Sequence, residues 1–249
     1  MDAAEIWTFL PLAMLGAYLV GLSKGGLPVV GMLAVPILAF RIDPLTAAAL
    51  LLPIYLISDV YGMVLYRRYF DARNLKILIP AGLLGVLLGY LLAPYVSAGA
   101  MSVAVGCVGV FHCVRHWFFT DKDTDPVPAR VGPGVFWGTL AGLTSFISHA
   151  GAPPFQVYVL PQRLPKLVFA GTAQFTFSVI NFAKLPPYLA LGRFPQMDLL
   201  AIGLLCVTAL GGAWSGARLT RIIPETIFYA AIRLALFALS ISLIWKGLT

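Results

Sequence analysis

Long apolar runs dominate this sequence and leave few alternatives for its fold. They fall near residues 5–22, 44–66, 75–97, 99–119, 131–147, 167–190, 197–217 and 224–245. A helix of about 17–25 apolar residues crosses the roughly 30 Å hydrocarbon core of a bilayer. The composition agrees, because 60% of the residues are hydrophobic and 11% are charged, whereas roughly a quarter of a soluble domain is charged. The sequence therefore predicts an all-α polytopic membrane protein whose outer surface faces lipid.

Two further apolar runs, 28–40 and 153–161, are too short to cross a bilayer comfortably as straight helices. Each directly follows a glycine-containing polar segment, SKGGLP at 23–28 and SHAGAP at 148–153. Irregular backbone at membrane depth is tolerated only where protein buries it or where it lines a wet cavity. We therefore expect helices broken at 23–28 and 148–153, next to such a cavity.

The distribution of lysine and arginine favours ten crossings with the N-terminus outside. In that arrangement the cytoplasmic loops contain Arg67, Arg68, Arg73, Lys76, Arg115, Lys122, Arg130, Arg163, Lys166, Arg218 and Arg221, while Arg41, Arg193 and Lys246 fall outside. Eight crossings would divide the same charges less unevenly, so ten crossings obey the positive-inside rule better. Because the basic residues are scattered among loops, the net charge of +7 does not indicate a nucleic-acid-binding face.

The chain contains two related halves. Ser23-Lys24-Gly25-Gly26-Leu27-Pro28 aligns with Ser148-His149-Ala150-Gly151-Ala152-Pro153 at an offset of 125 residues, and near that offset Asp59 meets Asn181, Tyr66 meets Tyr188 and Tyr90 meets Trp214. Five segments in each half would insert the halves in opposite orientations, which is a transporter architecture; duplication for packing alone is the alternative. We expect an N-terminal membrane repeat at 1–119, a cytoplasmic linker at 120–130 and a C-terminal membrane repeat at 131–249.

Three stretches carry a resemblance to a known family: GLSKGGLPVVGMLAVPIL at 21–38, TSFISHAGAPPFQVYVLPQRLPKLVFAGT at 144–172 and NFAKLPPY at 181–188. With them, nearly the whole chain resembles the TauE/SafE family of membrane proteins, the sulfite exporters and their relatives. The resemblance implies a small-anion carrier, for sulfur oxyanions or organosulfonates, in the prokaryotic cytoplasmic membrane. Pro28 and Val29 stand where glycines are frequent in the family, and alanines flank Gly151, so the resemblance leaves the identity of the anion open.

The two breaks offer the chemistry of an anion site. The candidate substrate-binding residues there are Ser23, Lys24, Gly25, Gly26, Ser148, His149, Ala150 and Gly151. A helix that restarts after a break directs free N–H groups and the positive end of its dipole at the gap. Serine hydroxyls donate hydrogen bonds, Lys24 supplies a full charge, and glycine permits close backbone approach. His149 stands where Lys24 stands, which favours two half-sites facing one oxyanion; the alternative for Lys24 is a cationic anchor at a helix end.

Further polar residues lie deep within the apolar runs. Asp59 is one of them, and a carboxylate at membrane depth is costly unless it is paired or functional. We expect it either to exchange a proton during transport or to be the counter-ion of Lys24 or Lys184. Asn181 and Lys184 lie one helical turn apart, and Gln174 precedes Asn181 by seven residues. The three therefore share a helical face and complete the candidate substrate site.

These features predict a secondary transporter that exports a small anion such as sulfite or an organosulfonate, driven by the proton or potential gradient. The sequence has neither a Walker-type loop nor an HExxH motif, so ATP hydrolysis and zinc-peptidase chemistry are not expected. A passive anion channel and a membrane-embedded enzyme are the alternatives. The cysteines lack metal-ligand spacing, so no metal and no cofactor are expected. The expected partners are the anion, the lipid bilayer and protons, and homo-oligomerisation is left open.

Overall fold

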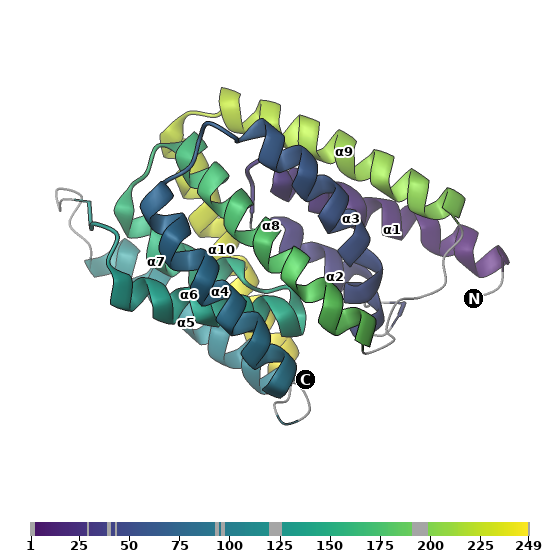
Figure 1. Cartoon of the computed structure of the whole chain (residues 1–249), viewed down its shortest axis with the longest axis horizontal. Coiled ribbons are helices and arrows are strands. Elements are labelled where there is room, and N and C mark those ends of the chain that lie inside the picture. Colours follow the sequence, from purple (N-terminus) through teal and green to yellow (C-terminus); the bar gives the residue numbers. More distant parts are fainter. Residues whose placement is uncertain are drawn as a thin grey trace.

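The computed structural model describes residues 3–28, 30–38, 41–42, 44–92, 95, 98–119, 126–190 and 199–248. Every regular element within those residues is helical (Figure 1). The first half contains α1 (Ala3–Lys24), η1 (Val30–Leu33), α2 (Ala34–Leu38), α3 (Pro44–Leu65), α4 (Ala72–Leu92) and α5 (Ala98–Phe119). The second half contains α6 (Val131–Ser148), α7 (Ala152–Val159), η2 (Leu160–Gln162), α8 (Lys166–Ala190), α9 (Leu199–Ile222) and α10 (Glu225–Leu248). The long helices coincide with the long apolar runs and the short ones with the two short runs, so the all-helical prediction is confirmed.

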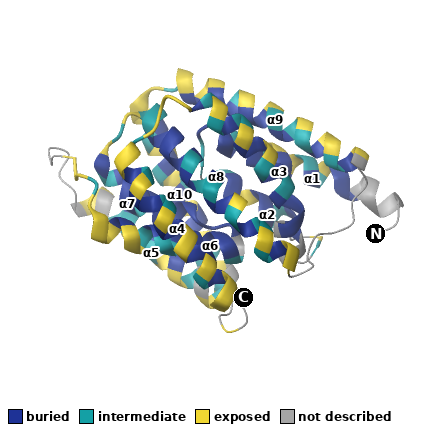
Figure 2. Ribbon diagram, viewed as in Figure 1, coloured by how far each residue is buried: buried dark blue, intermediate teal, exposed yellow. Residues whose placement is uncertain are grey.

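The exposed residues lie along the outward faces of the helices (Figure 2). Large apolar side chains are exposed on several helices, among them Val64, Phe111, Val207, Leu234 and Trp245. Soluble proteins rarely expose apolar surface on this scale. Three helical stretches within the described residues are long and apolar enough to cross a membrane: Ala72–Leu92, Leu200–Ile222 and Glu225–Trp245. Shorter apolar stretches in α1, α3, α5 and α6 accompany them, so the chain is a multi-pass membrane protein.

Both predicted breaks are present. α1 ends at Lys24, and Gly26 follows with a φ of 116°, a left-handed conformation that favours glycine. At the end of α6, His149 takes a φ of 53°, and its N–H bonds back to the Ser145 carbonyl. A residue other than glycine is uncommon in that conformation. The second break therefore holds an imidazole side chain at a cost in backbone strain.

In the first half, a short helix returns along a long one. Gly16 of α1 faces Ala34 and Leu38, so α2 runs back along α1. α3 then runs in the direction of α1, and just past its end Tyr66 Oη donates a hydrogen bond of 2.6 Å to the Gly25 carbonyl at the first break. The order is a long helix, a break, a short returning helix and a second long helix.

The second half repeats this order. Tyr158, near the end of α7, donates a hydrogen bond of 3.1 Å to the carbonyl of Arg130, which directly precedes α6. α7 therefore runs back along α6. α8 then runs in the direction of α6 until Tyr188 Oη donates to the Phe146 carbonyl at 3.0 Å. Tyr188 and Tyr66, which the sequence aligns, thus each donate to a backbone carbonyl near the end of the broken helix of their own half, although the two acceptors, Phe146 and Gly25, do not align.

Helices of the two halves pack in pairs (Figure 1). α1 lies along α9 and α4 along α6, each pair running in the same direction, whereas α3 is antiparallel to α8 and α5 to α10. Glycines bring the backbones close: a Cβ built on Gly21 would lie 1.9 Å from the Ala209 carbonyl oxygen, and one on Gly85 would lie 2.0 Å from that of Thr139. Small residues of this kind are typical of helix interfaces in membranes.

Gly85→Ala is expected to lower the melting temperature of the protein in detergent, because the new methyl group would collide with the Thr139 backbone and force α4 away from α6. Overpacking of this kind costs about 1–3 kcal/mol. The matched control is Gly211→Ala in α9, where nothing lies within 4 Å of an added Cβ and the helix propensity of alanine favours the variant. Equal melting temperatures for the two variants would contradict the close contact between α4 and α6.

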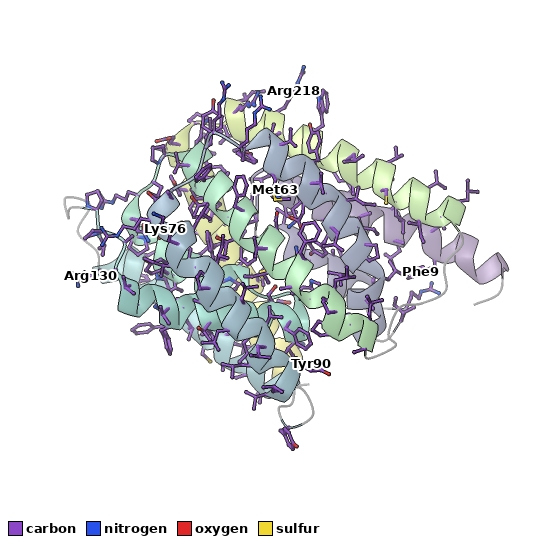
Figure 3. All side chains as sticks on the ribbon, in the orientation of Figure 1. Phe9, Met63, Lys76, Tyr90, Arg130 and Arg218 are labelled. Carbon is purple, nitrogen blue, oxygen red and sulfur yellow. The ribbon has the colours of Figure 1, made fainter. Side chains whose placement is uncertain are left out.

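Polar chain segments gather at one end of the molecule. At the start of α4, Asn74 Nδ2 donates a hydrogen bond of 2.7 Å to Gln162 Oε1 of η2. Figure 3 shows Lys76, Arg130 and Arg218 toward this end, and Phe9 and Tyr90 toward the other. The basic residues at this end belong to the segments that the charge distribution predicts to be cytoplasmic.

Candidate functional site

A small cavity lies between the two breaks. Its polar wall consists of Ser23, Lys24, Ser145, His149, Gln174 and Asn181. Its apolar wall consists of Pro28, Gly31, Met32, Tyr55, Gly151, Ala152, Ala173 and Phe177. The cavity volume is about 40 Å³, and one water molecule needs about 10–15 Å³ of such space. The site is therefore sized for a small ion and not for a large substrate.

Lys24 and Asp59 form a buried ion pair beside the cavity. Lys24 Nζ lies 2.7 Å from Asp59 Oδ1, and the two side chains are 5% and 0% exposed. The carboxylate also accepts hydrogen bonds from Gln174 Nε2 at 3.0 Å, Ser178 Oγ at 2.9 Å and Asn181 Nδ2 at 2.8 Å. Lys24 and these three side chains are all hydrogen-bond donors, which suits a carboxylate with its roughly four acceptor positions. Asp59 is thus the counter-ion of Lys24, one of the two lysines that the sequence left as alternatives.

Lys184 is fully buried in α8, and no carboxylate of the described residues lies within ion-pair distance of it. Its Nζ lies 2.7 Å from Ser145 Oγ, 3.1 Å from Asn181 Oδ1 and 3.5 Å from His149 Nδ1. These acceptors carry no negative charge. Two lysines therefore share the site with one aspartate, so a protonated Lys184 would have no counter-ion within ion-pair distance among the described residues. An unbalanced buried charge is costly, and a bound anion would offset it.

Tyr55 brings residues of the two breaks together. Its ring stacks on the His149 ring with centroids 5.2 Å apart and an angle of 10° between the planes. Lys24 Nζ lies 5.1 Å from the centroid of the same tyrosine ring, and Tyr55 Oη donates to the Gly31 carbonyl at 2.8 Å. His149 Nε2 is buried and has no hydrogen-bond partner among the described residues. The cavity wall therefore carries a hydrogen-bonding atom that a ligand can satisfy.

The structure brings several of the predicted site residues to the cavity wall: Ser23, Lys24, His149, Gly151, Gln174 and Asn181. Lys184 lies behind this wall, in contact with residues that line it. Gly25, Gly26 and Ala150 are not part of the wall. The side chain of Ser148 lies outside the described residues.

Gly25 serves helix packing where the sequence predicted ligand contact. A Cβ on Gly25 would lie 2.5 Å from the Ala217 amide nitrogen of α9. Its carbonyl accepts hydrogen bonds from Tyr66 at 2.6 Å and from Thr220 at 3.0 Å. A glycine that allows close approach of a ligand and one that allows close approach of a helix look alike in a single sequence.

Residues 21–25 also read G-x-S-x-G, the pattern of a serine-hydrolase nucleophile elbow. That elbow needs an exposed serine on a sharp turn between a strand and a helix. Here Ser23 lies in the last turn of α1 and donates its hydroxyl hydrogen to the Val20 carbonyl at 2.6 Å. The two glycines face α9, so packing explains the pattern and it does not indicate a hydrolase.

The second break leaves few backbone N–H groups free for a ligand. The N–H groups of His149 and Phe155 bond within the chain, and Pro153 and Pro154 have no N–H to offer. Gly151 and Ala152, at the start of α7, line the cavity. At most the N–H groups of Gly151 and Ala152 could therefore contribute to anion binding, about half of the four free N–H groups at a regular helix N-terminus.

Sequence reasoning misses Tyr55 and Ser145. Tyr55 precedes Asp59 by four residues and Ser145 precedes His149 by four, so each lies one turn along the face of a predicted site residue. This spacing is the signal that could have found them. Phe177 has the same spacing, four residues before Asn181. Met32 gives no such signal, because an apolar side chain in a membrane helix suits lipid and protein neighbours equally well.

Fold and site together define a class: a multi-pass helical membrane protein with a small cavity, lined by Lys24 and His149, where two broken helices meet. The family model of the sulfite exporter TauE/SafE matches residues 5–243, and the chain belongs to this family. It is accordingly a membrane transporter of sulfite-like anions and not an enzyme. Comparisons with curated proteins and with solved structures give no match. The described residues contain no group of three or more histidine, cysteine, aspartate or glutamate side chains that could hold a metal ion.

Proposed function

We propose that this protein is a secondary transporter that exports one small anion, sulfite or an organosulfonate, across a prokaryotic cytoplasmic membrane. The observation that carries the proposal is the charge of the site, because Lys184 lacks an acidic partner among the described residues. A monoanion held near Lys24 and His149 would balance that charge. The apolar wall, which includes Met32 and Phe177, suits the sulfur or carbon side of such an anion, and the polar wall suits its oxygens.

We infer further that 1–119 and 131–249 are inverted repeats joined by a cytoplasmic linker at 120–130. Helices exchanged by a two-fold axis in the membrane plane run antiparallel where they meet, as α3 with α8 and α5 with α10 do. The same axis would exchange the α1–α9 pair with the α6–α4 pair, and both of those pairs run parallel. The similar hydrogen bonds of Tyr66 and Tyr188 add to this support. Inverted repeats with broken helices at the substrate site are a recurring transporter architecture.

The helices pack into two groups, and movement of one group relative to the other would give alternating access to the cavity. α9 packs against α1 and α3, while α4 packs against α6 and α8. Each group thus contains one broken helix and one long helix from the other half. The cavity lies between the groups, and Asp59 of α3 connects them through Gln174 and Asn181 of α8. Rocking of one group against the other about this contact would open the cavity to each side in turn.

Thermal stabilisation by anions tests the substrate assignment. A ligand that binds only the folded protein stabilises it by about 2.7 kcal/mol at a concentration of one hundred times Kd. We expect sulfite and methanesulfonate to raise the melting temperature of the purified protein in detergent, and chloride at the same ionic strength to leave it unchanged. Equal shifts with all three anions would show a general salt effect and contradict the assignment, as would the absence of any shift.

We also propose that Asp59 takes up and releases a proton during the cycle, as its ion pair with Lys24 breaks and re-forms. Asp59→Asn keeps the shape of the side chain and one oxygen that can accept from Gln174 and Ser178, but it removes the titrating group and one of the two acceptor oxygens. This variant is expected to lose gradient-driven accumulation of the anion in proteoliposomes and to retain anion exchange. A variant that still concentrates the anion against its gradient would assign Asp59 to a structural ion pair alone.

Topology is tested by labelling cysteines from outside. We expect a membrane-impermeant maleimide to reach Tyr95→Cys but not Arg68→Cys, in a background in which Cys107, Cys113 and Cys206 are replaced by alanine. Both positions are exposed in the structure, so a difference reports sidedness and not burial. The loop at 192–196, outside the described residues, is predicted to be external as well. Labelling of both cysteines from the same side would contradict the proposed arrangement.

A further inference from the structure

We propose that Lys184 is a positioning residue that fixes the tautomer of His149 and directs the imidazole proton at the bound anion. The inference rests on the proposed anion site, but its first test does not require an anion. Lys184 is fully buried and does not line the cavity. The residues around its ammonium group, Ser145, His149 and Asn181, all do. Lys184 therefore acts on the cavity through its neighbours.

The assignment of the protons rests on the three hydrogen-bond partners of the Lys184 ammonium group. An ammonium group has three N–H donors and no acceptor. Asn181 presents Oδ1 to it at 3.1 Å, because Nδ2 of the same amide donates to Asp59 at 2.8 Å. Ser145 Oγ at 2.7 Å and His149 Nδ1 at 3.5 Å complete the set. All three donors are used, so the ammonium has none left for a ligand.

The contact with Lys184 determines which ring nitrogen of His149 carries the proton that faces the cavity. A neutral imidazole carries one ring proton, so a ring whose Nδ1 accepts from Lys184 carries its proton on Nε2. Nε2 is buried with no partner among the described residues, and the residue is 7% exposed. Stacking on Tyr55 fixes the plane of the ring. A buried donor without an acceptor is costly, and an oxygen of the anion would satisfy it.

This arrangement restricts which ligand atoms His149 can bind. With Nδ1 engaged by Lys184, His149 can donate to an oxygen of the ligand but cannot accept from a hydroxyl group. The charge of a protonated Lys184 favours a negative ligand, although its ammonium does not touch that ligand. Lys184 thus contributes charge and proton direction, while Lys24 and His149 make the contacts.

The first test is the tautomer itself. We expect ¹⁵N NMR of histidine-labelled protein in detergent at about pH 8, where ordinary histidines are neutral, to show His149 with a protonated Nε2 and an unprotonated Nδ1. Comparison with His149→Gln identifies its signals among those of the three histidines. A protonated Nδ1 in the wild type would overturn the inference. This result is independent of whether any anion binds, so it separates the inference from the proposed function.

Variants of Lys184 supply the second test. Lys184→Gln keeps a donor for Nδ1 and loses the charge, so we expect the tautomer to be retained and the affinity for sulfite to fall roughly tenfold or more. Lys184→Met loses both, so we expect mixed tautomers and an equal or greater loss of affinity. Wild-type affinity in Lys184→Gln, or an unchanged tautomer in a folded Lys184→Met, would overturn the inference. If Lys184→Met does not fold, the wild-type spectrum and Lys184→Gln decide.

Discussion

Asp59→Ala is expected to destabilise the folded protein by about 3–5 kcal/mol, the usual cost of removing one partner from a buried ion pair. The substitution would leave Lys24 buried without its counter-ion, 2.7 Å from where the carboxylate stood. It would also leave the donors of Gln174, Ser178 and Asn181 without their shared acceptor. We expect a large fall in the melting temperature measured in detergent without any anion.

The control replaces both charges. Lys24→Met/Asp59→Leu removes both members of the ion pair and leaves Lys184 as it is in the wild type, and apolar replacement of a buried pair is often neutral or stabilising. The double variant is therefore expected to melt well above Asp59→Ala while failing to bind sulfite, because it lacks the positive charge at the cavity wall. A melting temperature for Asp59→Ala equal to that of the wild type would show that the ion pair does not hold α1 to α3.

His149→Ala is expected to weaken anion binding roughly tenfold or more, because a hydrogen bond to a charged ligand contributes about 1.5–3 kcal/mol. The imidazole lines the cavity and its Nε2 has no partner among the described residues, so its loss removes a ligand contact, together with the ring that stacks on Tyr55 and the contact of Nδ1 with Lys184. Calorimetric titration with sulfite measures the change.

His149→Gly separates this binding effect from damage to the fold. Position 149 has a φ of 53°, which costs a non-glycine residue about 1 kcal/mol or more and glycine very little. The glycine variant should therefore melt above the alanine variant, while both bind the anion equally poorly. Wild-type affinity in either variant would remove His149 from the list of ligand contacts.

The helices and their breaks could be predicted because the bilayer restricts them so strongly. A spanning helix needs a long apolar run. The two runs that are too short form η1 with α2 and α7 with η2, and residues of η1 and α7 line the cavity. Asn181 and Lys184 could be placed on one face from their spacing, and the structure joins them at 3.1 Å. Each of these predictions needs only the length or the residue spacing of a single helix.

The pairings between helices could not be predicted in the same way. Whether Asp59 meets Lys24 or Lys184 depends on where α1 and α8 cross α3, and packing of small residues decides that crossing. The same limit applies to Gly25, which faces α9 and not the cavity. His149 and Lys24 align in the sequence, and both contact the ring of Tyr55. His149 stacks its own ring on it, whereas Lys24 places its amino group over it. The shared contact with Tyr55 depends on how the helices pack and cannot be predicted from the alignment.

Counterflow in proteoliposomes tests the central claim most directly, because a carrier exchanges anions through one binding site and a channel does not. Vesicles containing the purified protein are loaded with unlabelled sulfite and diluted into a trace of labelled sulfite. A carrier predicts transient accumulation of label inside the vesicles, saturating with external sulfite and lost in Lys24→Met/Asp59→Leu. A flux of label that neither saturates nor accumulates would identify a passive channel and contradict the account.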